Sequence, residues 1–263
     1  MSLDLFFAEN PLLPSSREKY SYLIGLFLKE IKDPEVCGPG EILRWLDATG
    51  WSSATRYVAV VAVKRYIRWL YGNKHPALRL REKRRASKPH KILKPDQLRT
   101  LVQSFDTSTS KGKRNLAIVC LAIDTGFRLA ELANLRAANV DFDERIALVP
   151  VKGGEWSRGL FSAYTASMLV SWMAYRKEDD PRLFQISRDG LRVTVRRWGE
   201  KLGFHLSPHM FKHTGATLAT RQGAPTRVLQ EAYRWKKIEM AEHYTQEISA
   251  EDFRPYFGTN ILE

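Results

Sequence analysis

The chain has 263 residues, of which 44% are hydrophobic and 27% charged, a composition typical of a globular protein with one or two domains. Its formal net charge of +13 predicts a polyanionic partner, with nucleic acid as the first candidate and a solvated basic surface as the alternative. The two cysteines show no pairing motif, and no signal peptide or membrane-spanning apolar run is recognisable. We therefore expect a cytoplasmic, nucleoid-associated protein that contains no disulfide framework and has no membrane partner.

The first part of the chain predicts a helical DNA-binding domain over residues 1–80. Apolar residues recur at helical spacing over 15–32, 42–46 and 54–71, and Pro and Gly separate these segments. The expected apolar face of the third helix consists of Val58, Val61, Ala62, Tyr66 and Trp69. Lys64, Arg65 and Arg68 lie beside that face and are candidates for DNA contacts.

A strongly basic segment follows this domain. The stretch RLREKRRASKPHKILK contains eight Lys or Arg, one acidic residue and one proline. Like charges at this density repel one another, so residues 81–94 are expected to form an interdomain linker. We assign Arg84, Arg85 and Lys88 to contacts with the DNA backbone, and a solvated connector without contacts is the alternative.

Residues 95–246 predict a second domain, and the whole chain is expected to be mainly α-helical with a small antiparallel β-sheet. Helical patterns cover residues 95–105, 114–124, 164–177 and 188–202, and a further helix begins at Arg128. Residues 145–151 and 157–161 flank Gly153-Gly154 and predict a hairpin whose turn carries Lys152.

Two regions of this second part are candidates for intermolecular contacts. The helix over 188–202 carries Arg188, Arg192 and Arg196 near one side, which we expect to enter a DNA groove. Residues 247–263 contain apolar side chains and are expected to form a C-terminal tail that contacts a neighbouring protomer.

The residues from Ser207 to Gln246 gather the side chains needed to cleave a phosphodiester. His209, Lys212 and His213 are spaced i, i+3 and i+4 and share one helix face, and Trp235 and Tyr244 follow. Cationic and N–H donors stabilise the charge that develops on phosphate oxygens, and a positioned tyrosine can form a covalent ester. This chemistry needs no metal and no cofactor, and the two histidines lack the further ligands of a zinc site.

Four motifs in order resemble the tyrosine recombinases, the phage integrase family. They are TGFRLAELANL around Arg128, HMFKHTGATLA around Lys212, AYRW ending at Trp235, and IEMAEHYTQ around Tyr244. The resemblance covers nearly the whole chain and implies a helical core-binding domain followed by a mixed α/β catalytic domain. It also implies a site-specific recombinase that cuts and rejoins DNA strands through a Holliday junction.

The resemblance implies a role for each residue that matches a motif. Tyr244 would attack the scissile phosphate and form a 3′-phosphotyrosyl bond. Arg128 would clamp the phosphate oxygens and Glu131 would orient it. Lys152 would protonate the departing 5′-oxygen as general acid.

The same resemblance assigns the remaining polar residues of the last stretch. His209 would donate to the phosphate or take the proton of the tyrosine, and His213 would support the site from behind. Trp235 would offer its indole N–H. Lys212 stands where the family pattern has a second arginine, so the charge is kept and the planar fork is lost. Tyr-Arg before Trp235, in place of Leu-Gly, is a second departure.

The same resemblance implies the partners of the protein and leaves two alternative functions open. We expect a double-stranded DNA recombination site as substrate, a homotetramer on two duplexes, and an accessory DNA-bending or directionality factor. One alternative is relaxation of supercoils by a monomer, as in type IB topoisomerases. The other is a DNA-binding architectural or regulatory protein with impaired catalysis, which the lysine at position 212 keeps open. The sequence leaves the target site open, together with the choice among integration, excision and dimer resolution.

Overall fold

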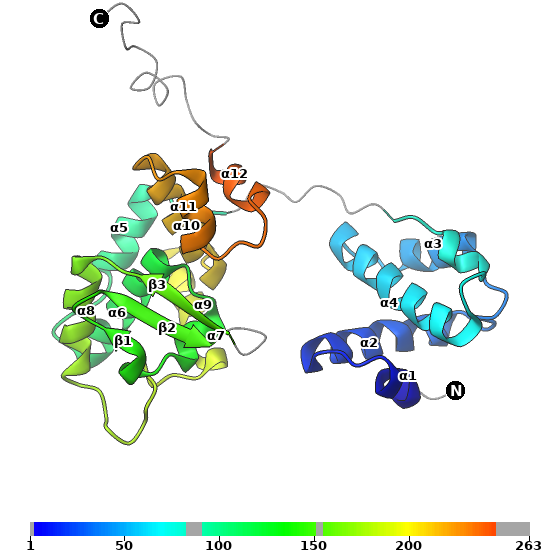
Figure 1. The fold of residues 1–263 in the computed structure, drawn as a ribbon, viewed down its shortest axis with the longest axis horizontal. Coiled ribbons are helices and arrows are strands. Elements are labelled where there is room, and N and C mark those ends of the chain that lie inside the picture. The colour runs from blue at the N-terminus through cyan, green and yellow to red at the C-terminus, as the bar shows by residue number, and fades with distance from the viewer. Residues whose placement is uncertain (1–2, 83–90, 151–154, 246–263) are drawn as a thin grey trace, which may run out of the picture. The chain divides into compact units, whose positions relative to one another are not determined.

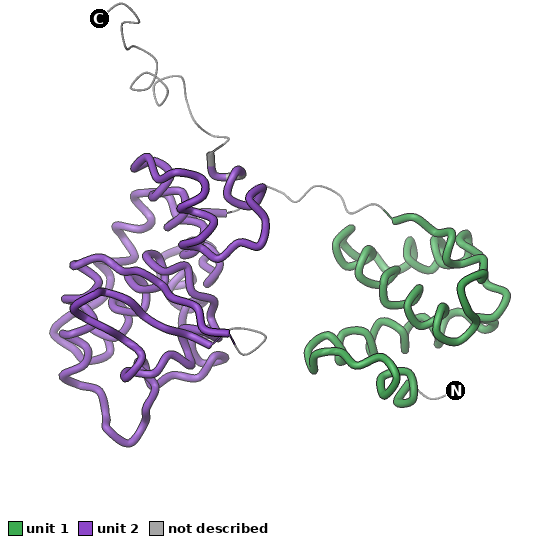
Figure 2. The backbone as a smooth tube through the Cα atoms, viewed as in Figure 1, with its two compact units in different colours: residues 1–88 green, residues 89–263 purple. Residues whose placement is uncertain are grey.

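The computed structural model describes residues 3–82, 91–150 and 155–245. The chain divides into two compact units, Met1–Lys88 and Pro89–Glu263, which we describe separately (Figure 2). Among the described residues, no helix is long and apolar enough to cross a membrane. Helices dominate both units, and the only sheet in the described residues is a small antiparallel one, which confirms the predicted fold class.

Unit 1 is a group of helices around one apolar core. Its elements are α1 (Leu3–Glu9), α2 (Pro14–Glu30), α3 (Pro39–Ala48), α4 (Ser53–Tyr71) and the 3-10 turn η1 (Pro76–Arg79). Helix α1 was not expected from the sequence. It contributes Phe6, whose ring packs edge-on against Tyr66 of α4 at 5.4 Å between centroids.

The buried face of α4 differs from the expected one. The helix buries Ala59, Val60 and Val63 together with the predicted Ala62 and Tyr66, whereas Val61 is exposed. The residues from 57 to 63 are nearly all apolar, so hydrophobic periodicity leaves the phase of the helix undetermined here. Packing against α2 and α1 fixes the phase instead.

Unit 2 contains the remaining elements (Figure 1). They are α5 (Pro95–Gln103), α6 (Ser110–Thr125), α7 (Leu129–Asn134), η2 (Ala137–Asn139), β1 (Val140–Asp141), β2 (Ile146–Pro150), β3 (Trp156–Leu160), α8 (Ala163–Met173), α9 (Arg188–Leu202), α10 (Pro208–Arg221), α11 (Thr226–Ala232) and α12 (Glu239–Thr245). The sheet has the order β1-β2-β3, and Leu148 pairs with Arg158 in the predicted hairpin. The short strand β1 was not expected.

Helix α6 is the centre of unit 2. It is buried from Leu116 to Ala122 and packs against α8, α10 and β3. It ends at Gly126, which has φ 58 and ψ 26, the left-handed conformation expected for the residue after a helix. A Cβ atom at this glycine would lie 2.3 Å from Cδ1 of Tyr233, so the chain turns where only glycine fits. Arg128 follows two residues later.

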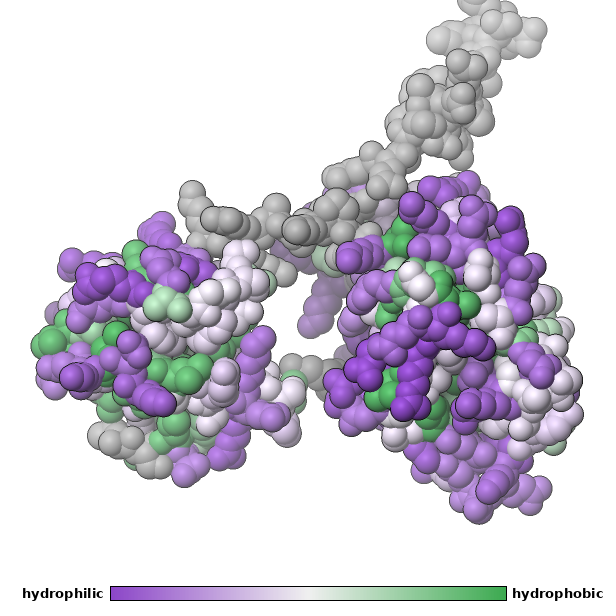
Figure 3. Space-filling view, turned by 180° about the vertical axis from the view of Figure 1, so that it is seen from behind, coloured by the Kyte–Doolittle hydropathy of each residue, from purple (hydrophilic) through white to green (hydrophobic). Residues whose placement is uncertain are grey.

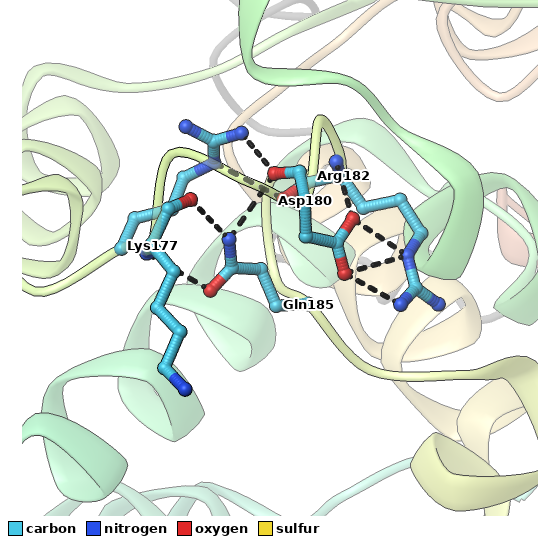
Figure 4. Close-up of polar contacts among 5 residues, drawn as sticks. Lys177, Asp180, Arg182 and Gln185 are labelled. Atoms are coloured by element: carbon cyan, nitrogen blue, oxygen red, sulfur yellow. Dashed lines mark hydrogen bonds and ion pairs between the residues drawn. The ribbon is translucent and has the colours of Figure 1, made fainter.

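The connection from α8 to α9 is held by its own polar contacts (Figure 4). The guanidinium of Arg182 donates to both carboxylate oxygens of Asp180, and this pairing lowers the pKa of Asp180 to about 2. Gln185, with φ 49, donates to the carbonyl oxygens of Lys177 and Asp180. The backbone N–H of Leu183 donates to the carbonyl of Leu135, which ties this connection to the end of α7.

Candidate active site

Helix α10 brings the predicted polar residues to the centre of the site. Its tight packing on α6 depends on Gly215, where a Cβ atom would lie 2.1 Å from the carbonyl oxygen of Ile123. Helices α11 and α12 pack beside α10 (Figure 1). Three helices that are separate in sequence therefore place their polar side chains around one point.

Lys212 is buried, with 7% of its surface exposed. Its ammonium group donates to the carbonyl oxygen of Tyr233 at 2.6 Å and lies 5.6 Å from the ring centroid of Trp235. Burial is the main cause that lowers the pKa of Lys212 to about 8, and the charges of Arg234 and Arg128 contribute to this shift against the opposing effect of Glu131. At neutral pH the group is a cation that is close to losing its proton.

Tyr244 on α12 lies with its hydroxyl on His213 and its ring on Trp235. The rings of Tyr244 and Trp235 are stacked at 4.9 Å between centroids, and the phenol oxygen forms a short hydrogen bond with Nδ1 of His213. Burial raises the pKa of Tyr244, so the phenol keeps its proton, and which of the two groups donates in this bond depends on the tautomer of His213. His213 is therefore the imidazole in direct contact with the candidate nucleophile.

Arg128 is the N-cap residue of α7 and is fixed by Glu131. Its backbone N–H donates to Oε2 of Glu131 at 2.7 Å, and its Nη1 donates to Oε1 at 2.9 Å. The Arg128 side chain is 55% exposed and the Glu131 side chain 10%. The guanidinium thus faces solvent on a buried carboxylate support, which suits a group that meets a phosphate.

Arg234 stands out in the sequence only as a departure from the family pattern, yet it lies inside the site. Its Nη2 donates to Oε2 of Glu131 at 3.1 Å and to the carbonyl oxygen of Gly126 at 3.0 Å. Its guanidinium also lies over the ring of Phe127, 4.6 Å from the centroid. The spacing of the polar residues gave no signal for this contact, because it joins segments about a hundred residues apart.

Trp235 connects the two halves of the site. Its ring is stacked between Tyr233, at 5.4 Å, and Tyr244, at 4.9 Å. Arg234 precedes it and reaches Glu131, which holds Arg128. The structure therefore links the predicted residues in a chain of contacts: Lys212 and Tyr244 lie against Trp235, His213 lies against Tyr244, and Arg128 and Glu131 join this chain through Arg234.

The other predicted catalytic residues are placed differently. His209 is exposed on the first turn of α10, with its ring 6.5 Å from that of His213. Lys152 lies outside the described residues. Within the described part of the chain, no group of three or more His, Cys, Asp and Glu side chains could hold a metal ion.

The candidates for DNA contact fall into three groups. On α4, Lys64 donates to the carbonyl oxygen of Leu80 and Arg68 is exposed, while Arg65 contacts Asn10 at 3.5 Å. On α9, Arg188, Arg192 and Arg196 are exposed, and within the described part of the chain their ion pairs are with acidic residues of the same helix. Arg84, Arg85 and Lys88 lie outside the described residues. The face of unit 2 seen in Figure 3 is mostly hydrophilic, with hydrophobic side chains between the polar ones.

Comparison with known proteins gives consistent matches. The model of the phage integrase family matches residues 91–251. The tyrosine recombinase XerA of Pyrococcus horikoshii is 24% identical over 239 residues, which cover 86% of this chain and 81% of that protein.

Two solved structures with similar folds were determined with DNA. The Tn1549 transposon integrase in complex with a circular intermediate DNA has a TM-score of 0.74 at 13% identity and covers 97% of this chain and 98% of its own. The XerH site-specific recombinase bound to its difH substrate has a TM-score of 0.68 at 17% identity, over 93% of this chain and 82% of its own.

Proposed function

Because the chain belongs to the phage integrase family, we propose that it is a site-specific DNA recombinase that cuts and rejoins strands with Tyr244 as nucleophile. One chain of contacts carries this proposal: the Tyr244 hydroxyl contacts His213, Trp235 contacts the Tyr244 ring and buried Lys212, and Arg234 next to Trp235 contacts the Glu131 that holds Arg128. Relatives described as tyrosine recombinases and structural neighbours determined with DNA support the substrate class.

The chemistry starts from a neutral phenol, since burial raises the pKa of Tyr244. As the phenol oxygen bonds to phosphorus, its proton passes to Nδ1 of His213, which lies within hydrogen-bond distance of the hydroxyl and takes the proton in the tautomer that leaves Nδ1 unprotonated. The bond from phosphorus to the 5′-oxygen breaks, and that oxygen takes a proton from Lys152. The 3′-phosphate is then held as a tyrosyl ester, and attack by another strand's 5′-hydroxyl reverses these steps.

The extra negative charge of the transition state falls near the cations of the site. The exposed guanidinium of Arg128 supplies a planar pair of donors, and the ammonium of Lys212 supplies charge from the interior. His209, exposed on the same helix as His213, is available to donate to a phosphate oxygen. Trp235 fixes the ring of Tyr244 by stacking.

The larger assembly follows from strand exchange. Joining strands from two duplexes requires a nucleophile on each of four strands, so four protomers on two duplexes and a Holliday junction are part of the proposal. Contacts of residues 247–263 with a neighbouring protomer and an accessory DNA-bending or directionality factor belong to it as well. The domain roles are a DNA-clamping unit at 1–80, a backbone-contacting linker at 81–94 and a catalytic unit at 95–246.

Covalent capture from a pool of random sequences tests the proposal and identifies the target site at the same time. The protein is incubated with a random library of duplexes nicked so that a short cleaved fragment diffuses away and the ester persists. Wild-type protein is expected to give adducts that survive denaturation and share a sequence, and Tyr244→Phe is expected to give none. Equal adduct yields from the two proteins would show that Tyr244 is not the nucleophile.

Two other outcomes would point to the alternative functions. Relaxation of supercoiled DNA without any enriched sequence would indicate a topoisomerase. Sequence-specific binding without adducts would indicate a regulatory DNA-binding protein, which the engagement of Lys212 with the Tyr233 carbonyl favours among the alternatives. In that case Lys212→Arg is the informative variant, because a large gain in cleavage would show that the native site is impaired.

A further inference from the structure

Arg234 combines three features that each oppose folding. Its backbone has φ 55, a left-handed conformation that residues with a Cβ atom rarely adopt. Its side chain is only 13% exposed, and burial lowers its pKa. Two of its nitrogen atoms, Nε and Nη1, are buried without a hydrogen-bond partner among the described residues. A buried guanidinium with unmatched donors calls for an explanation in function rather than in stability.

Among the described residues, the side-chain contacts of Arg234 all surround Arg128. Its Nη2 donates to the carbonyl oxygen of Gly126 at 3.0 Å, and its guanidinium covers the ring of Phe127 at 4.6 Å. These two residues immediately precede Arg128 in the chain. The third contact is with Glu131, the carboxylate on which Arg128 rests.

Glu131 divides its two oxygen atoms between the two arginines. Oε1 accepts from Nη1 of Arg128 at 2.9 Å. Oε2 accepts from the backbone N–H of Arg128 at 2.7 Å and from Nη2 of Arg234 at 3.1 Å. Without Arg234, the carboxylate would lose one of these three contacts, and Oε2 would keep only the bond from the backbone N–H of Arg128. The orientation of the Arg128 guanidinium therefore depends on a second guanidinium behind it.

We propose that Arg234 is a positioning residue for Arg128, acting through Glu131 and the carbonyl of Gly126 so that the exposed guanidinium is preset for a phosphate. This inference rests on the proposed strand cleavage and deepens it. Arg234 does not touch the phosphate, because its unmatched nitrogen atoms are buried. Its role is to hold in place a group that must meet the transition state within a fraction of an ångström.

Arg234→Gly separates this role from a structural one. Glycine adopts φ 55 without strain, so the melting temperature is expected to equal or exceed that of wild type. Single-turnover cleavage on the captured target DNA is expected to fall by about 10- to 100-fold. Arg234→Lys keeps the charge but loses the planar donors of the guanidinium, so its rate should lie between those of wild type and Arg234→Gly. Arg145→Gly is the matched control, since Arg145 has φ 53 and is exposed, and its rate should equal that of wild type.

A double-variant cycle tests the route of action. If Arg234 works through Glu131, the loss of rate in Glu131→Gln and the loss in Arg234→Gly should not multiply when the two are combined. Multiplying losses would overturn the proposal, because Arg234 would then act on its own. An unchanged rate in Arg234→Gly would overturn it as well.

A measurement on the free protein keeps the test independent of cleavage. The side-chain Nε–H signal of Arg128 in a nitrogen–proton NMR spectrum is assigned by its loss in Arg128→Lys. This signal is expected to shift or broaden in Arg234→Gly and to stay in place in Arg145→Gly. If wild-type protein cleaves no DNA, the proposed function fails, and the NMR result still decides whether Arg234 positions Arg128. A signal that does not move would refute the positioning role.

Discussion

At Lys212, the positive charge that the site uses lowers the stability of the folded protein. An ammonium group surrounded by protein loses most of its hydration, and two arginines add repulsion. The carbonyl of Tyr233 and the ring of Trp235 provide partial compensation. The result is a cation whose pKa, about 8, lies well below the ordinary value of 10.5. This loss of stability has a functional reason, because a phosphodiester substrate requires positive charge near its oxygen atoms.

The stability of the protein should therefore depend on pH through Lys212. Between pH 8 and pH 10.5 the unfolded chain binds the proton and the folded protein does not, so raising the pH through this range favours folding. The penalty, about 3 kcal/mol from the size of the pKa difference, is fully present below pH 8. Urea unfolding of wild type and Lys212→Met across this range measures it. The variant should lack the rise, and parallel profiles would contradict the assignment of the pKa.

The activity should respond to the same titration in the opposite direction. Above pH 8 Lys212 becomes neutral, so a cleavage step that uses its charge should slow as the pH rises. In Lys212→Arg the charge persists, because the guanidinium does not titrate in this range, and the decline should disappear. Cleavage rates at saturating DNA from pH 7 to pH 9.5 check this. A decline of equal size in both proteins would exclude Lys212 as its source.

At the scale of elements, the site depends on how closely α10 approaches α6. Gly215 leaves room for the carbonyl of Ile123 and for the hydroxyl of Tyr233, which donates to that carbonyl at 3.3 Å. The close approach brings Lys212 beneath Tyr233 and sets His213 against α12. If α10 lay farther from α6 by the width of one methyl group, the side chains of Lys212 and His213 would move away from their partners.

Gly215→Ala should consequently destabilise unit 2. The added Cβ would lie 2.1 Å from a backbone oxygen that cannot easily move, and such overpacking costs about 1–3 kcal/mol. Gly25 on α2 is the matched helix glycine, with no atom within 4 Å of a built Cβ. Gly25→Ala should stabilise its own unit by about 0.5–1 kcal/mol through helix propensity. Thermal unfolding of each variant measures both effects, and equal signs would refute the argument from close packing.

At the scale of the whole molecule, the net charge of +13 governs affinity for DNA. Each phosphate neutralised by Lys or Arg releases a counterion, so binding should weaken steeply with salt. In the described residues, the exposed arginines of α9 pair with acidic residues of their own helix, and such exposed pairs are weak. They remain available for phosphates.

Replacing Arg188 and Arg192 by glutamine should reduce the slope of log affinity against log salt by roughly 1–2. Arg99 and Arg227 are the control pair, since both are exposed and their replacement changes the net charge equally. Binding to captured target DNA at several salt concentrations gives both slopes. If the two pairs of substitutions lower the slope by the same amount, the arginines of α9 contact DNA phosphates no more than other exposed arginines do.

Much of this organisation was predictable because its causes are local. Hydrophobic periodicity, proline and glycine breaks and the Gly153-Gly154 turn predicted the helices and the hairpin. The polar residues of the last stretch predicted phosphodiester chemistry by their type and spacing. Basic composition predicted a polyanionic partner before any fold was known.

Tertiary structure alone decided which of these side chains meet. The phase of α4, the choice of His213 over His209 as the partner of Tyr244, and the place of Arg234 behind Arg128 depend on contacts between segments far apart in sequence. A residue's type and spacing describe its own helix, whereas the distance to another helix is set by packing of the intervening core. The sequence by itself determined which reactive side chains the protein has. The close approach of α6, α10 and α12 determined which of these side chains contact one another.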